Sequence, residues 1–206
     1  MLPAAAWAAL VSGFALGLSL IVAIGPQNLF VLRQGALRRG VGLVVGICAL
    51  SDIVLISAGV LGGALVFNPG TALLGMVRDA GAAFLLVYSA LAARRAWRPP
   101  PAPGVAVGAP SPAGTAAGAL AFTWLNPAAW LDTVVIVGSA ANSDPRRHLL
   151  VGLGAASASV AWFAALGFGA RVLAPVFTRR AAWRLLDGLT SVVMLGVAAR
   201  LLLWGR

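Results

Sequence analysis

Six long apolar stretches make up most of this 206-residue chain. They lie at about residues 4–32, 41–66, 71–93, 113–140, 149–173 and 181–204. A helix that crosses the hydrocarbon core of a bilayer needs about 20 apolar residues, and each stretch reaches that length. With 61% hydrophobic and 10% charged residues, the chain lacks the polar surface of a soluble domain. The sequence therefore predicts an all-α integral membrane protein with six transmembrane helices.

The longest linker, residues 94–112, is rich in Pro, Gly and Ala and contains three consecutive prolines, Pro99 to Pro101. Consecutive prolines favour an extended conformation that does not pack. This linker separates a first three-helix unit, residues 1–93, from a second, residues 113–206. Because three helices reverse the side of the membrane, the second unit enters in the opposite direction. The sequence thus predicts two inverted repeats.

Arginine supplies all 15 basic residues and aspartate all five acidic ones, which gives a net charge of +10. The arginines cluster between apolar stretches, a placement that suits membrane topology and anionic headgroups rather than nucleic-acid binding. Ten arginines lie in or beside the odd-numbered linkers and five lie elsewhere. Because cytoplasmic loops are enriched in basic residues, we expect those linkers in the cytoplasm and both termini outside. The first stretch is too long for a signal-peptide core and is expected to be retained.

A short polar segment built around a proline interrupts the first apolar stretch of each unit. The first segment is Gly25-Pro26-Gln27-Asn28, and the second is Trp124-Leu125-Asn126-Pro127. Broken helices are tolerated at membrane depth only where protein or a water-filled cavity covers the backbone. Matched breaks in two halves indicate the substrate site of a secondary transporter. The alternative is a pair of proline kinks that only shape packing.

The residues at the breaks favour new half-helices that begin inside the membrane. Asparagine is a preferred N-cap and proline a preferred first helical residue, so we expect a half-helix to start at Asn126-Pro127. Its free amides and positive dipole end would attract a carboxylate. Gly25-Pro26 is expected to act similarly, with Gln27 and Asn28 adding side-chain donors and acceptors.

Two aspartates lie within apolar stretches, Asp52 beside Ser51 and Asp132 beside Thr133. A carboxylate at the bilayer centre costs about 2.5–3.5 kcal/mol on insertion scales, so each should face the bundle interior. We interpret both as sites for a substrate cation or a proton. The alternative is a neutral carboxylic acid that hydrogen-bonds to a neighbouring helix. Asp187, three residues after Arg184, is explained by a local ion pair.

The chain carries few residues suited to other chemistry. It has one cysteine, Cys48, within an apolar stretch, and one histidine, His148, in a loop, so we expect no disulfide within the chain, no metal site and no cofactor. Neither a Gly-x-Ser-x-Gly segment nor a His-Glu pair is present. These observations argue against an enzyme.

At these residues the chain resembles the LysE/ArgO family of basic amino-acid exporters. The resemblance lies in Ile24-Gly25-Pro26-Gln27-Asn28, Val31-Leu32-Arg33-Gln34-Gly35, Ser51-Asp52-Ile53, Thr123-Trp124-Leu125-Asn126-Pro127, Leu131-Asp132-Thr133, Gly167-Phe168-Gly169-Ala170 and Trp183-Arg184. It implies a bacterial inner-membrane exporter of L-lysine and/or L-arginine, driven by the proton gradient and without a prosthetic group. The chain has Ala128 and Trp130 where the family pattern carries Asn or His and then Tyr, and Asp187 where Asn is more usual.

The predicted substrate site combines the two breaks with the two aspartates and their neighbours, namely Gly25, Pro26, Gln27, Asn28, Ser51, Asp52, Asn126, Pro127, Asp132 and Thr133. Asp52 and Asp132 are also the candidates for proton coupling. Moving one positive charge outward costs about 2.3 kcal/mol per 100 mV, and an inward proton cancels that term. The alternatives are an exporter of neutral amino acids such as homoserine or threonine, and a membrane scaffold that transports nothing. Whether copies of the chain form a homo-oligomer is left open.

Overall fold

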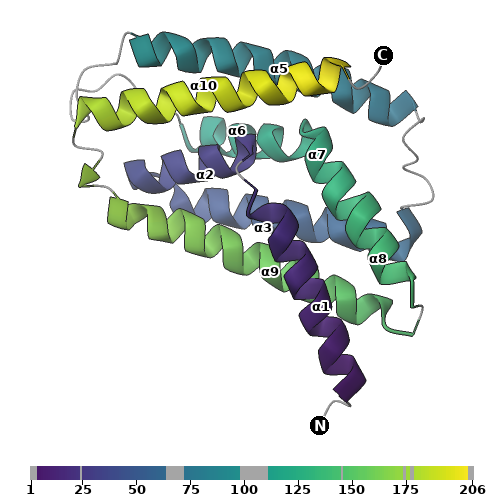
Figure 1. Cartoon of the computed structure of the whole chain (residues 1–206). Coiled ribbons are helices and arrows are strands. Elements are labelled where there is room, and N and C mark those ends of the chain that lie inside the picture. Colours follow the sequence, from purple (N-terminus) through teal and green to yellow (C-terminus); the bar gives the residue numbers. More distant parts are fainter. Residues whose placement is uncertain are drawn as a thin grey trace.

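The computed structural model describes residues 4–23, 25–63, 72–97, 111–144, 146–173, 175–176 and 179–203 of the chain. Helices and the turns between them make up this part of the chain, with no strand among these residues (Figure 1). Most of the predicted linker, residues 98–110, lies outside the described residues.

Each half of the chain contains a broken helix followed by two long ones. The first half forms α1 (Ala4–Ile21), α2 (Pro26–Leu37), α3 (Val41–Ala58) with its π-helical continuation η1 (Gly59–Gly63), and α5 (Ala72–Trp97). The second half forms α6 (Pro112–Trp124), α7 (Pro127–Trp130), the π-helix η2 (Leu131–Val137), α8 (Gly138–Asn142), α9 (His148–Gly169), the 3-10 turn η3 (Ala170–Leu173) and α10 (Arg180–Leu203).

Four helical segments within the described ranges are long and apolar enough to cross a membrane: Ala4–Ile21, Val41–Gly62, His148–Val172 and Arg180–Leu203. Pro112–Trp124 and Ala128–Asn142 make a fifth if this pair, bent by 62°, is counted as one span. The all-helical membrane architecture is therefore confirmed. The finer prediction of six spans in two inverted repeats stays a prediction.

The long helices pack in two groups. α5 lies antiparallel along α10, while α1 and α3 both pack on α9 (Figure 1). Aromatic side chains join α2, α5 and α6: the Phe122 ring contacts the rings of Phe30, Phe84 and Tyr88 at centroid distances of 4.9, 4.9 and 4.7 Å. Such tilted and edge-to-face contacts add to the gain from burying the rings.

Glycines allow the backbones to approach closely at two crossings. A Cβ atom at Gly13 of α1 would lie 2.1 Å from the carbonyl oxygen of Val151 in α9. A Cβ atom at Gly138 would lie 2.7 Å from the carbonyl oxygen of Gly59, where η1 meets the second broken helix. Small residues at such crossings are typical of membrane helices, whose association depends on close van der Waals packing.

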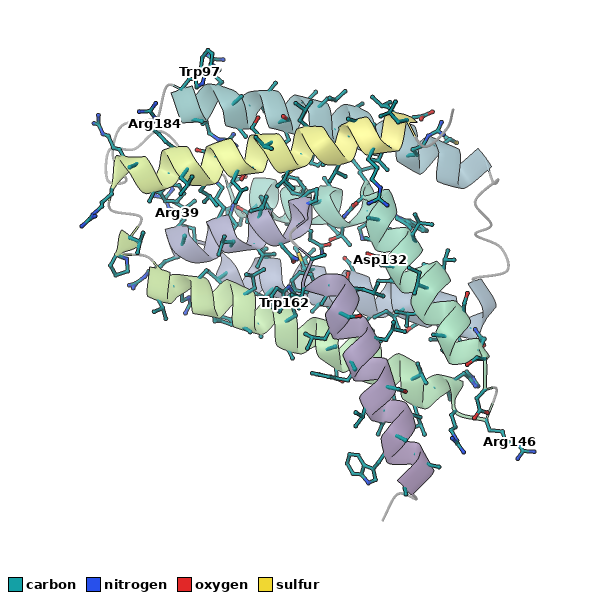
Figure 2. All side chains as sticks on the ribbon, in the orientation of Figure 1. Arg39, Trp97, Asp132, Arg146, Trp162 and Arg184 are labelled. Atoms are coloured by element: carbon teal, nitrogen blue, oxygen red, sulfur yellow. The ribbon has the colours of Figure 1, made fainter. Side chains whose placement is uncertain are left out.

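The arginine-bearing ends of the helices gather at one end of the molecule. α2, α5 and α9 end at the left of Figure 1, where α10 begins. Arg39, Trp97 and Arg184 lie at this end in Figure 2, whereas Arg146, between α8 and α9, lies at the opposite end. The three odd-numbered linkers of the sequence prediction therefore start on the same side.

Asp187 of α10 pairs with arginines of two other helices. Its carboxylate, 3% exposed, forms ion pairs with Arg33 of α2 and, at 3.1 Å, with Arg95 of α5. The Nε of Arg184 instead donates to the carbonyl oxygen of Ala96 at 3.1 Å. The local pair expected between Arg184 and Asp187 is thus wrong, because Asp187 faces inward between α2 and α5.

Candidate functional site

A cavity of about 360 Å³ lies where the two helix breaks meet. Residues of α1, α2, α3, the α6–α8 segment, α9 and α10 line it. The polar and charged residues among the described ones in its wall are Gln27, Asn28, Asp52, Asn126, Asp132, Thr133, Ser159 and Arg200. The structure therefore brings together most of the residues predicted for the site.

Asn28 stabilises the first break through hydrogen bonds of both its side-chain nitrogen and its side-chain oxygen. The carbonyl groups of Ile21 and Ala23 have no helical donor after α1 ends, and the Asn28 Nδ2 donates to both, at 2.7 and 2.8 Å. The Asn28 Oδ1 accepts from the Nε1 of Trp162 in α9 at 3.2 Å. Figure 2 shows Trp162 beside the connection between α1 and α2. Asn28 thus supplies the partners that a broken helix needs at membrane depth.

The N-terminus of α2 faces the cavity without a side-chain cap. Gly25 is the N-cap residue, in an extended conformation, and Pro26 occupies the first turn. The Gln27 Nε2 donates across to the Thr123 Oγ1 of α6 at 2.9 Å, which ties the two breaks together. Unpaired amides and the helix dipole place positive potential at this end of the cavity.

The second break begins as expected and then departs from an α-helix. The Asn126 Oδ1 accepts from the backbone N–H of Ala128 at 3.2 Å, and Pro127 is the first residue of α7. After only four residues α7 passes into the π-helix η2, which carries Asp132 and Thr133. Single π-helical turns within α-helices are frequent at functional sites. The sequence predicted an ordinary helix here, because residue preferences do not distinguish a π-turn.

Asp52 is buried and hydrogen-bonded across the bundle. It is 3% exposed, and its Oδ2 accepts from the Ser159 Oγ of α9 at 2.8 Å. Ser159 was not predicted as a site residue, because nothing in the apolar stretch 149–173 shows which of its serines faces α3. The Ser157 Oγ, two residues earlier, donates to the carbonyl oxygen of Gly154 in its own helix.

Ser51, also predicted as a site residue, is not among the residues that line the cavity. Its Oγ accepts from the Nε1 of Trp124 at 3.1 Å, and the Trp130 Nε1 donates to the Trp124 carbonyl oxygen at 2.9 Å. Successive residues of a helix point about 100° apart, so Ser51 and Asp52 cannot share one narrow face. Ser51 supports the second break instead.

Asp132 is the less buried of the two cavity aspartates, and Figure 2 shows it on the side of the α7–α8 segment that faces the other helices. No donor among the described residues forms a hydrogen bond or a close ion pair with its carboxylate. The guanidinium of Arg200, from α10, attracts it electrostatically, and the carboxylate of Asp52 repels it. Thr133, which also lines the cavity, donates its hydroxyl to the carbonyl oxygen of Ala129. Asp132 therefore presents an open carboxylate to the cavity.

The described residues contain no group of three or more His, Cys, Asp or Glu side chains that would hold a metal ion. Cys48 is free and buried.

Apolar spans around a charged cavity, with two helix breaks in its wall, define a membrane transporter as a class. The family model "LysE type translocator" matches residues 18–205, and the chain belongs to this family. It is a multi-pass membrane translocator and not an enzyme.

Three relatives illustrate the similarity. The putative amino-acid transporter Rv0488 of Mycobacterium tuberculosis is 47% identical, over 88% of this chain and 90% of its own. The arginine exporter protein ArgO of Yersinia enterocolitica is 40% identical over 94% and 96%. The lysine exporter LysE of Corynebacterium efficiens is 34% identical over 95% and 98%. No solved structure matches the chain.

Proposed function

We propose that this protein exports L-arginine and/or L-lysine from the cytoplasm across a bacterial inner membrane. The observation that carries the proposal is the open carboxylate of Asp132, which shares a cavity with Asp52 at the meeting point of two broken helices. A charge within a membrane protein requires a counter-charge, and a cationic substrate supplies one. The similarity to an arginine exporter and a lysine exporter over almost the whole chain supports the same substrate class.

The two carboxylates have different surroundings and therefore different roles. Asp132 is free to take a cationic group directly, whereas Asp52 already accepts a hydrogen bond from Ser159. A cation that reaches Asp52 binds a carboxylate that also keeps its hydrogen bond to Ser159. The uncapped N-terminus of α2 adds positive potential that favours a carboxylate in the same cavity, while the N-terminus of α7 is capped by Asn126.

Transport is coupled to protons in this proposal. Export of one positive charge against a potential negative inside costs about 2.3 kcal/mol per 100 mV, and one proton moving inward cancels that cost. Asp52 and Asp132 are the candidate proton carriers, because a carboxylate that binds either a proton or the substrate cation enforces their exchange. No other acidic residue of the described part lines the cavity.

The orientation and internal symmetry belong to the same proposal. The odd-numbered linkers face the cytoplasm and the termini face outward. The contacts of α3 with α9 and of α5 with α10 pair helices that occupy equivalent positions in the two halves, which supports two inverted repeats.

Exchange in proteoliposomes tests the function. Vesicles that contain the full chain and unlabelled arginine or lysine should take up the labelled amino acid, and an imposed pH gradient should change the rate. We expect Asp132→Asn and Asp52→Asn to lower exchange at least about tenfold, since one lost charge interaction of about 1.4 kcal/mol suffices for that factor. Asp144→Asn is the matched control, because Asp144 is half exposed and pairs with Arg147 in a loop.

Wild-type exchange by Asp132→Asn and Asp52→Asn proteins that insert normally would refute the carboxylate assignment. Stronger competition by homoserine or threonine than by lysine would favour a neutral amino-acid exporter. A reconstituted protein that exchanges none of these amino acids would support the scaffold alternative.

A further inference from the structure

Arg200 is the one basic residue among the described residues of the cavity wall. It lies on α10, three residues before that helix ends at Leu203. In the sequence, an arginine at this position indicates only that the apolar stretch is close to its end. In the structure it brings a positive charge to the cavity that holds Asp52 and Asp132.

Arg200 faces Asp132 without closing on it. The two side chains line one cavity and interact electrostatically, yet the ion pairs within 4 Å in the described part of the chain do not include them. No acceptor among the described residues takes a hydrogen bond from Arg200. On the same helix, by contrast, Asp187 closes on Arg33 and Arg95. α10 therefore carries Asp187, which is paired with two arginines, and Arg200, which faces the cavity without a close ion pair among the described residues.

We propose that Arg200 holds the α-carboxylate of the substrate and makes the cavity select amino acids over the corresponding amines. This inference rests on the proposed function for its substrate class. The guanidinium presents five N–H donors in a planar fork that matches a carboxylate, and few other side chains bind that group as specifically.

The arrangement fits the head of an α-amino acid. The ammonium and carboxylate of the substrate are bonded to one carbon atom. They therefore need an acidic and a basic partner that lie near each other but do not form an ion pair with each other. Asp132 and Arg200 form such a pair, with the ammonium at Asp132 and the carboxylate at Arg200. Asp52, on the neighbouring α3, is left for the cation of the substrate side chain.

The charges of the cavity also match this assignment. Two carboxylates and one guanidinium are the inverse of an arginine or lysine molecule, which carries two positive groups and one negative group. Each charge of a cationic amino acid thus finds a partner. A neutral amino acid leaves one cavity carboxylate without a cation, and an amine leaves the guanidinium of Arg200 without an anion.

Competition for arginine exchange tests the role of Arg200. Labelled arginine exchange by the full chain in proteoliposomes is inhibited with unlabelled arginine or with agmatine, which is arginine without its carboxylate. For the wild-type protein we expect agmatine to require at least a tenfold higher concentration for half inhibition. Arg200→Gln should raise the arginine value at least tenfold and leave the agmatine value unchanged, and Arg200→Lys should fall between. Arg147→Gln, at an exposed loop pair, should behave as wild type.

The different effect of Arg200→Gln on inhibition by arginine and by agmatine distinguishes binding of the carboxylate from a structural role. Equal losses for both compounds in Arg200→Gln would show that Arg200 only positions the site and would overturn the inference. Unchanged values for both would mean that α2 holds the carboxylate or that Arg200 only reaches lipid headgroups, and would also overturn it.

Failure of the proposed function has a different signature. A wild-type protein that exchanges threonine but neither arginine nor lysine would refute the proposed function. The role of Arg200 is then tested by competition for threonine exchange with threonine and with its decarboxylated amine, 1-aminopropan-2-ol. Arg200→Gln should raise the concentration for half inhibition by threonine and leave that for the amine unchanged. A protein that exchanges none of these compounds would refute both.

Discussion

Asp52 and Asp132 reach one cavity from different helices, and they differ in burial and in hydrogen bonding. The Asp52 carboxylate is held by the Ser159 hydroxyl at 2.8 Å, whereas Asp132 has no such partner in the described structure. A hydrogen bond to an ionised group is worth about 1.5–3 kcal/mol when the partner is left buried. Ser159 therefore fixes the orientation of Asp52 and lowers the cost of its charge.

Substitution of Ser159 tests this at the scale of one residue. We expect Ser159→Ala to lower arginine exchange about tenfold, because the Asp52 carboxylate loses a charge-assisted hydrogen bond in a buried position. Ser157→Ala is the matched control, since the Ser157 hydroxyl bonds to Gly154 of its own helix and should leave exchange unchanged. Exchange by both variants in proteoliposomes is the measurement. Equal rates for the two variants would contradict the role of Ser159.

The acidic residues of the candidate site could be predicted from the sequence, but the residues that interact with them could not. Asp52 and Asp132 were predictable because a carboxylate in an apolar stretch needs an explanation wherever that stretch packs. Ser159 and Arg200 were not. A serine in a helix can satisfy itself on its own backbone, as Ser157 does, and an arginine near a helix end is ordinary at a membrane interface. Only the packing of α9 and α10 shows where these two side chains point.

At the scale of the elements, the two breaks are closed by different means. Asn28 bonds to the last carbonyls of α1, while Asn126 caps the amides of α7. Proline and asparagine mark both breaks in the sequence. The π-helical turns η1 and η2 carry no such mark. They meet where a Cβ atom at Gly59 would lie 2.5 Å from the carbonyl oxygen of Val134, a contact between two segments far apart in the sequence.

The Asp187 cluster joins three elements, α2, α5 and α10. We expect Asp187→Asn to lower the free energy of unfolding by about 3–5 kcal/mol, because Arg33 and Arg95 keep their charges in a poorly solvated place without a carboxylate. Unfolding by heat or denaturant in detergent micelles measures the change. Asp79→Asn is the matched control, since Asp79 is 64% exposed beside Arg78, and its loss should cost at most about 1 kcal/mol.

A loss at Asp187 no larger than the loss at Asp79 would show that the cluster does not tie the three helices together. The combined variant Asp187→Asn, Arg33→Gln and Arg95→Gln gives a second check. It should recover part of the stability that Asp187→Asn loses, because the uncompensated charges are removed as well.

At the scale of the whole molecule, the apolar stretches predicted a helical membrane protein, and the breaks predicted one shared site. Both follow from local composition and from the scarcity of water in a bilayer. The bend of 62° in the second broken helix did not follow from the sequence. It depends on how the halves close around the cavity, which no single stretch of residues specifies.

The gathering of arginine-bearing helix ends leads to a last prediction, on orientation. Trp97 lies at that end of the molecule and Arg146 at the other (Figure 2). The exposed Ser143 follows the last residue of α8, three residues before Arg146. Cys48 is the single cysteine of the sequence, so a Cys48→Ala background carries no competing thiol. A membrane-impermeant maleimide should modify Ser143→Cys in intact cells but Trp97→Cys only after lysis, because basic ends are retained in the cytoplasm. The reverse pattern would refute the proposed orientation, and labelling of both thiols in intact cells would contradict the placement of these ends on opposite sides of the membrane.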